Sequence, residues 1–308
     1  MPARKLPAKL PFSNLPPQQP MNPRADAYGQ TAILLSQLAA IETRCALDLP
    51  YGPAPAQRLD IYMPDDRSLK DLPVFINIHG GGWMFGYKEW MGVNAPPIVT
   101  GSAIYVAIEY TLSPAARFPT QIDDCVAALA WVYRNIVRYG GSPDRIHVGG
   151  HSAGGHLCAL MALRRDLLTK AGLPADVIKA CFPYSGVYDL RDLVAYGFDN
   201  DIHGGPRQAL LADPADARGA SPIAWIEGND TPFLIAWSEF DNMLCKAEGP
   251  SFAVALREQG GRVEAYQAPR FDHFWIHLDQ GWEGSKWTRT LLSWMHGDPK
   301  TAPVLEAL

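Results

Sequence analysis

The segment GHSAGG, residues 150–155, places Ser152 between glycines in the pattern G-x-S-x-G. The strand pattern RIHVGG leads into it and the helical pattern AGGHLCALMALRR follows, so Ser152 stands at a turn from an expected strand into an expected helix. Such a turn strains the serine backbone and exposes its hydroxyl, and small neighbours avoid collisions. Because an ordinary tight turn can carry the same pattern, a nucleophilic role for Ser152 needs support from elsewhere in the chain.

A second glycine run, HGGGW at residues 79–83, follows the apolar run VFINI. A serine that attacks a carbonyl needs backbone N–H groups aimed at the oxyanion that forms, and glycines let the backbone approach the substrate closely. We expect the N–H groups of Gly81, Gly82 and Ala153 to form this oxyanion hole, with His79 bracing the loop through a hydrogen bond. A phosphate-binding loop is the weaker interpretation, because neither G-x-G-x-x-G nor a lysine-serine pair accompanies the glycines.

Two carboxylates follow the apolar run PFLIAW, at Glu239 and Asp241. Open α/β sheets build their sites at the carboxyl ends of the strands, so either carboxylate could reach a catalytic histidine. Asp241 is favoured because it lies a few residues beyond the strand, where Asn242 continues a turn. Glu239 remains the alternative acid.

The candidate general base is His273, which follows the last expected strand in the segment APRFDHFWIH. A general base must reach the serine while its other ring nitrogen is held by the acid, and a loop histidine suits this geometry. His277, one helical turn later, is expected to be a surface or core residue. The chain order Ser152, Asp241, His273 is that of α/β hydrolases, so the four features together predict a serine hydrolase with a Ser-His-Asp triad.

Four aromatic residues lie beside these motifs in the sequence. They are candidates for lining an aromatic substrate pocket: Trp83, Tyr87, Tyr188 and Trp275.

No metal or cofactor is expected. His147, His151 and His156 cluster in the sequence, but no carboxylate or cysteine completes a ligand set with them. The five cysteines are scattered and never form C-x-x-C, which argues against a zinc knuckle or a disulfide framework.

Composition excludes several classes of partner. The chain has 308 residues and a formal net charge of −5, so it offers no basic face for nucleic acid. Its proline-broken N-terminus lacks the apolar stretch of a secretory signal, and no apolar run reaches transmembrane length. We therefore expect a cytoplasmic protein with a small-molecule ester or amide substrate and no membrane partner; a homodimer is compatible with the sequence.

Apolar β-branched runs alternate with helical patterns, which predicts an α/β fold with a mainly parallel sheet flanked by helices. Residues 1–45 are expected to form an arm with a lid helix over 27–45. Residues 46–300 form one hydrolase domain with a cap-like insertion at 187–225. The expected strands are 58–62, 74–78, 103–108, 145–149, 178–184, 233–237 and 262–267, and the expected helices include 121–139, 153–165, 246–259 and 282–295.

With these motifs in this order, the chain resembles the α/β-hydrolase superfamily, near its arylformamidase (kynurenine formamidase) and hormone-sensitive-lipase-like esterase branches. The resemblance runs from about Leu49 to the last helix. It rests on the segments YGPAPAQRLDIYMP, HGGGW, GHSAGGHL, SGVYDL and DHFWI, on the pair Ser221-Pro222, and on EYTLSPAARFP for the lipase-like branch.

The resemblance implies hydrolysis of a small acyl group from an aromatic amine or alcohol. Ser152 would attack, His273 would move the proton and Asp241 would orient His273, with no cofactor. Formamide and ester hydrolysis use the same machinery, so an arylformamidase-like enzyme is favoured and a carboxylesterase is the alternative. A non-catalytic ligand-binding homologue is disfavoured because every candidate role is filled. An interfacial lipase is disfavoured because no basic amphipathic helix is present.

Overall fold

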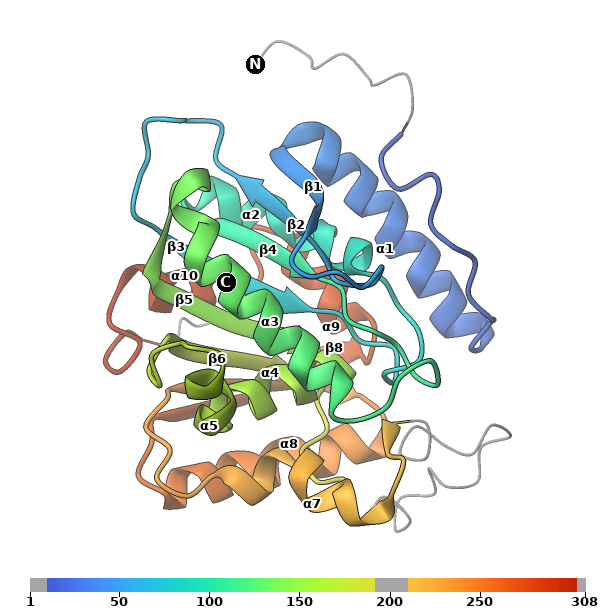
Figure 1. The fold of residues 1–308 in the computed structure, drawn as a ribbon, viewed down its shortest axis with the longest axis vertical. Helices are drawn as coiled ribbons and strands as arrows, with labels where there is room; N and C mark the ends of the chain where they lie inside the picture. Colours follow the sequence, from blue (N-terminus) through green and yellow to red (C-terminus); the bar gives the residue numbers. More distant parts are fainter. Residues whose placement is uncertain (1–9, 192–209, 304–308) are drawn as a thin grey trace.

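The structure is a computed structural model that describes residues 10–191 and 210–303. Its centre is an eight-stranded sheet with the order β1-β2-β4-β3-β5-β6-β7-β8. β2 is antiparallel to β1 and to β4, and the other neighbouring strands are parallel (Figure 1). The expected α/β fold with a mainly parallel sheet is confirmed.

Seven of these strands correspond to the seven expected from the sequence. The strands are β1 (Arg44–Pro50), β2 (Arg58–Met63), β3 (Leu72–Ile78), β4 (Ile104–Ile108), β5 (Gly141–His151), β6 (Ile178–Tyr184), β7 (Phe233–Phe240) and β8 (Val263–Asp272).

The edge strand β1 was not predicted. The preceding helix α1 (Pro23–Glu42) stops before Thr43, whose backbone is extended and whose N–H and hydroxyl both donate to the carbonyl of Ala39. The sheet therefore begins at Arg44, inside the range expected to be helical. β1 is only half-buried, so its sequence lacks the apolar alternation that marks a strand.

Helices cover both faces of the sheet. Val74, Ile76 and Ile78 of β3 point to the face covered by α3, α4 and α8, whereas Phe75 points to the face covered by α2, α10 and α1. The remaining helices have the bounds α2 (Ala95–Thr100), α3 (Thr120–Asn135), α4 (Ala153–Leu163), α5 (Arg165–Lys170), α7 (Ala217–Ala220), α8 (Met243–Glu258), α9 (Trp275–Leu278) and α10 (Lys286–His296).

The ends of the expected helices shift for local reasons. α8 begins three residues early because the Asn242 side chain accepts the N–H of Cys245 and so caps the helix. α4 ends at Leu163, since Arg164 leaves the helical conformation before α5 starts.

Two expected segments fall partly outside the described residues. Residues 1–9 of the expected arm and residues 192–209 of the expected insertion 187–225 lie outside the described residues. The described part of that insertion ends in two short 3₁₀ turns around α7. No helix in the described ranges combines the length and the apolar character needed to cross a bilayer.

Candidate active site

Ser152 occupies the turn between β5 and α4, with φ 54° and ψ −116°. This is a strained conformation for a residue with a side chain, and the Ser152 N–H donates to the carbonyl of Tyr184 at 3.0 Å. A Cβ on Gly150 would lie 2.3 Å from the carbonyl oxygen of Gly154, and one on Gly154 would lie 2.0 Å from that of Ile78. The two glycines are thus a steric requirement of the turn.

The structure brings Ser152, His273 and Asp241 together at the carboxyl ends of β5, β7 and β8. The Oγ of Ser152 lies 3.0 Å from Nε2 of His273, and Nδ1 of His273 lies 2.6 Å from Oδ1 of Asp241. His273 therefore stands between a hydroxyl and a carboxylate, with one ring nitrogen on each.

Asp241 is held by several donors besides His273. Its Oδ2 accepts the hydroxyl of Ser185 and the N–H of Ser238, and its Oδ1 accepts the N–H of Asn242. Burial by itself raises the pKa of Asp241, but the hydrogen bonds from His273 and Ser185 outweigh burial and leave that pKa below its usual value. The carboxylate is therefore ionised at neutral pH.

Glu239, the alternative acid, points elsewhere. Its Oε2 accepts the backbone N–H of Arg270 at 2.8 Å. Of these two carboxylates, that of Asp241 lies within hydrogen-bond distance of Nδ1 of His273, and the Asn242 amide lies 3.2 Å from the same nitrogen.

His151 contacts the backbone of His273, which the sequence did not predict. Its Nε2 lies 2.7 Å from the carbonyl oxygen of His273, and because a carbonyl only accepts, Nε2 carries the proton. Burial, with the neighbouring imidazoles of His273 and His277, lowers the pKa of His151 well below its usual value. His151 is thus a neutral donor that holds the backbone of His273.

His277 is a core residue, one of the two placements expected for it. It is fully buried, and its Nδ1 lies 2.9 Å from the hydroxyl of Tyr28. Burial lowers its pKa to about 3.

The glycine loop runs directly past the serine. A Cβ on Gly80 would lie 3.0 Å from Cβ of Ser152, and Gly81 and Gly82 adopt φ of 113° and 59°. The carbonyl of Gly81 accepts the N–H groups of Met84 and Phe85, which closes the loop on itself. Within residues 10–191 and 210–303, no group accepts a hydrogen bond from the N–H of Gly81, Gly82 or Ala153.

His79 braces this loop. Its Nδ1 lies 2.7 Å from the carbonyl oxygen of Gly80, its Nε2 lies 2.6 Å from Oε1 of Glu109, and its ring stacks on Tyr110. The other carboxylate oxygen of Glu109 accepts the N–H of Lys88.

The four aromatic candidates do not surround one cavity. Trp83 is buried and donates its Nε1–H to Nδ1 of His156 at 3.2 Å, while Trp275 is 59% exposed. Tyr188 lies in the core: its ring stacks on that of Phe252 in α8, with centroids 4.1 Å apart, and its N–H donates to the carboxylate of Glu248 in the same helix. Tyr188 is therefore not accessible to a ligand here.

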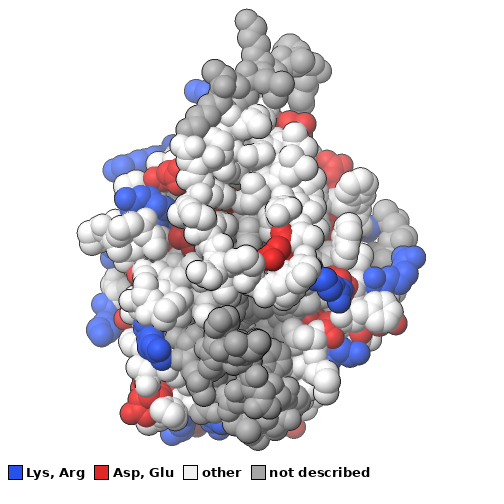
Figure 2. All heavy atoms as spheres, turned by 90° about the vertical axis from the view of Figure 1, so that its right-hand side faces the viewer, with Lys and Arg blue, Asp and Glu red and all other residues white. Residues whose placement is uncertain are grey.

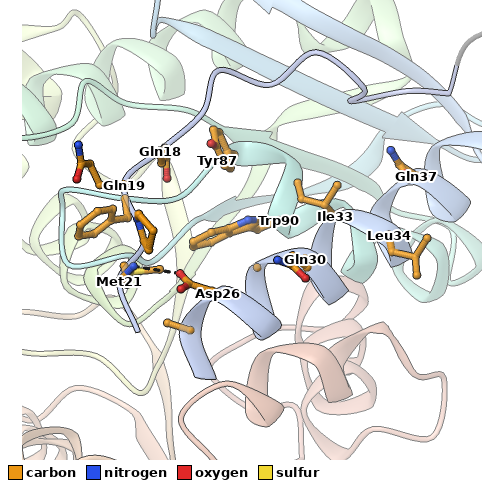
Figure 3. A pocket seen from close by; sticks show the side chains of 14 residues that line it. Gln18, Gln19, Met21, Asp26, Gln30, Ile33, Leu34, Gln37, Tyr87 and Trp90 are labelled. Carbon is orange, nitrogen blue, oxygen red and sulfur yellow. Dashed lines mark hydrogen bonds between the residues drawn. The ribbon is translucent and has the colours of Figure 1, made fainter. Parts of the chain in front are cut away.

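Tyr87 does line a cavity, of about 550 Å³ (Figure 3). The cavity lies between the N-terminal arm, α1 and the segment that follows the glycine loop. Its walls include Gln18, Met21, Ile33, Phe85 and Trp90.

One set of side chains in the described residues has the spacing of metal ligands: Asp241, Cys245 and His273. Asp241 and His273 are already hydrogen-bonded to each other, and the Cys245 thiol donates to the carbonyl of Ser185 at 2.9 Å. Burial raises the pKa of that thiol, which disfavours the thiolate that a metal needs. The donor set fits a proton relay better than a metal site.

Figure 2 shows the face that lies on the right-hand side of Figure 1. White, uncharged side chains cover much of that face, with acidic atoms among them near the centre, and lysine and arginine side chains lie toward its edges.

Comparison with known proteins gives a consistent family. A model of the BD-FAE family matches residues 59–256. The esterase LipQ of Mycobacterium tuberculosis is 34% identical over 242 residues, which are 73% of this chain and 56% of LipQ. The kynurenine formamidase of Salmo salar is 28% identical over 252 residues, which are 82% of each chain. The chain thus spans little more than half the length of LipQ but most of the formamidase.

Solved structures agree on the fold. An esterase of Pyrobaculum calidifontis is 24% identical with a TM-score of 0.69, covering 91% of this chain and 93% of the esterase. A truncated carbohydrate esterase from gut microbiota is 19% identical with a TM-score of 0.70, covering 84% of this chain and 97% of that one.

Proposed function

The chain belongs to the BD-FAE family of α/β-hydrolases, and from that premise we propose that it hydrolyses a small ester or formamide through a Ser152-His273-Asp241 triad. The observation that carries the proposal is the pair of hydrogen bonds on His273, to Ser152 at 3.0 Å and to Asp241 at 2.6 Å. A nucleophile with its base and an orienting acid in one line is the arrangement that acyl transfer requires.

In the first half-reaction, Oγ of Ser152 bonds to the substrate carbonyl carbon while Nε2 of His273 takes the hydroxyl proton. The carbonyl oxygen becomes an oxyanion, and its donors are the N–H groups of Gly81, Gly82 and Ala153, which have no acceptor among the described residues. The intermediate collapses, and the leaving alcohol or amine takes the proton from His273.

In the second half-reaction, water attacks the acyl-enzyme and gives its proton to His273. Collapse of the second intermediate releases the acid and returns the proton to Ser152. Asp241 remains ionised throughout and stabilises the imidazolium that forms in each half, in keeping with its lowered pKa.

The substrate class is an acyl group as small as formyl on an aromatic leaving group. The similarity to kynurenine formamidase over 82% of both chains supports the formamide and the aromatic leaving group. A broad carboxylesterase is the second candidate, because the 34% identity to LipQ exceeds the 28% identity to the formamidase.

The test compares kcat/KM for N-formylkynurenine with that for short-chain p-nitrophenyl esters, with Ser152→Ala as the blank. Formamide turnover above about 10⁴ M⁻¹ s⁻¹ supports the arylformamidase-like enzyme. Good ester turnover without formamide cleavage supports the carboxylesterase. If neither substrate is cleaved and an organophosphorus reagent does not label Ser152, the hydrolase proposal is wrong.

A further inference from the structure

We propose that residues 16–28 form a brace that positions both halves of the active site. One half is the glycine loop, residues 79–86, and the other is the histidine loop, residues 272–277. The brace comprises the end of the N-terminal arm and the start of α1, and it lies outside residues 59–256 that the family model matches. The inference rests on the proposed function, since it assigns positioning residues to that reaction.

Gln18 holds the far end of the glycine loop by two hydrogen bonds. Its side-chain amide donates to the carbonyl of Gly86 at 2.7 Å and accepts the N–H of Gly86 at 2.8 Å. One side chain thereby pairs with both the N–H and the carbonyl of Gly86, as the backbone of a neighbouring strand would. Two residues earlier, the carbonyl of Pro16 accepts the hydroxyl of Tyr87, and Figure 3 shows Gln18 beside Tyr87.

Gly86 in turn lies in close contact with the first residues of the glycine loop. It has φ 104°, and a Cβ there would lie 2.5 Å from both the carbonyl oxygen of Gly80 and Nδ1 of His79. The backbone of Gly86 thus packs against the peptide that leads into the expected oxyanion hole. Loss of the Gln18 contacts would let this end of the loop move relative to Ser152.

Tyr28 holds the histidine loop from the same segment. Its ring stacks on Phe274, with centroids 4.8 Å apart, and its hydroxyl lies 2.9 Å from Nδ1 of His277. Phe274 directly follows His273, so the stack limits the movement of the catalytic imidazole. At the exposed end of this contact, Arg24 pairs with Asp272 at 2.6 Å.

The two contacts come from one continuous segment of the chain. α1 starts at an Asn22 cap that accepts two backbone N–H groups, so the direction of the helix is set between Gln18 and Tyr28. Tyr28 also packs edge-on against Trp90, 5.3 Å away, and Trp90 lies in the segment after the glycine loop. A Cβ on Gly29 would lie 3.0 Å from the Trp90 ring, so α1 lies directly on that segment.

The brace therefore acts on the geometry of the transition state rather than on substrate affinity. Small displacements of catalytic groups lower kcat while leaving ground-state contacts with the substrate in place. A lid, which the sequence suggested, would chiefly change KM.

The experiment measures kcat and KM with a p-nitrophenyl ester in Gln18→Ala and Tyr28→Phe, with active serines counted by organophosphorus titration. Asn14→Ala is the matched control, because it removes an exposed amide from the same arm. We expect kcat per titrated serine to fall about tenfold or more in Gln18→Ala and severalfold in Tyr28→Phe, with KM within about twofold of wild type and no change in the control. Unchanged kcat per titrated serine in both variants overturns the brace, and a loss in only one overturns the two-loop form.

A second readout does not need catalysis. Amide hydrogen exchange in the peptide covering residues 79–90 should rise in Gln18→Ala and remain at the wild-type rate in Asn14→Ala. If wild type shows no Ser152-dependent turnover, the proposed function fails, and the exchange measurement still decides whether Gln18 holds the loop.

Discussion

Oε1 of Glu109 lies 2.6 Å from Nε2 of His79, and this pair supports the loop whose backbone passes Ser152. The same oxygen accepts the N–H of Tyr110, and Oε2 accepts the N–H of Lys88. Both oxygens of Glu109 thus act only as acceptors. The Glu109 carboxylate thus holds the start of the glycine loop at His79, and the Gln18 side chain holds its far end at Gly86.

Glu109→Gln should lower kcat about tenfold through displacement of the glycine loop, with a smaller effect on KM. The amide would turn its NH₂ group toward one of three donors, so at least one of these hydrogen bonds is lost. Steady-state kinetics on a p-nitrophenyl ester measures the effect, with the exposed Glu258→Gln as the control. Wild-type kcat in Glu109→Gln would show that the carboxylate does not position the loop.

Ser152→Ala should lower kcat by at least about 10⁴-fold and leave the thermal unfolding midpoint nearly unchanged, since it removes a single hydroxyl. Covalent labelling by an organophosphorus reagent, followed by intact-mass measurement, should disappear with it. Ser251→Ala, at an exposed serine of α8, should keep both turnover and label. Full activity in Ser152→Ala would remove the serine from the mechanism.

Asp241→Asn should lower kcat about 10⁴-fold, because an amide cannot hold His273 in the required tautomer while also accepting from Ser185. Glu239→Gln should change kcat by less than about twofold, since its hydrogen bond is to the backbone of Arg270. The two variants are compared at saturating ester. The reverse ranking would transfer the acid role to Glu239.

Acid should destabilise the protein through its buried histidines. Burial lowers the pKa of His147 from 6.5 to about 4. At His147, between these two values, the unfolded chain binds more protons than the folded one, so this histidine lowers the free energy of unfolding as the pH drops from 6.5 toward 4. His156, whose pKa burial also lowers to about 4, adds to this trend. The buried carboxyls of Asp60 and Glu248, whose pKa values burial raises to about 7, act in the opposite direction.

His147→Gln should therefore flatten the dependence of unfolding temperature on pH between 6.5 and 4. The slope, rather than the absolute unfolding temperature, is the quantity to compare, because the substitution also changes packing. An identical slope in His147→Gln would mean that His147 is not buried in its neutral form.

Local patterns predicted the sheet well because most of its strands are buried. β3 and β4 are buried at every position, so their apolar runs are unambiguous. β1 was missed because an edge strand with Arg44 and Asp48 has no such run. α1 was assigned correctly as a helix, but its role could not be predicted from its sequence, since its contacts lie on residues far along the chain.

The sequence by itself determined the turn at Ser152, the glycine loop and the order in which Ser152, the two candidate carboxylates and His273 occur. Each depends on steric demands within a few residues or on strand order, and both leave a trace in residue type and spacing. Only the tertiary structure showed that the Asp241 carboxylate contacts His273 while that of Glu239 binds the backbone of Arg270, that Tyr188 lies in the core, and that His151 and Tyr28 contact the histidine loop. These contacts join residues as far apart as Tyr28 and His277, and no local pattern records a distance that the packing of the whole sheet sets.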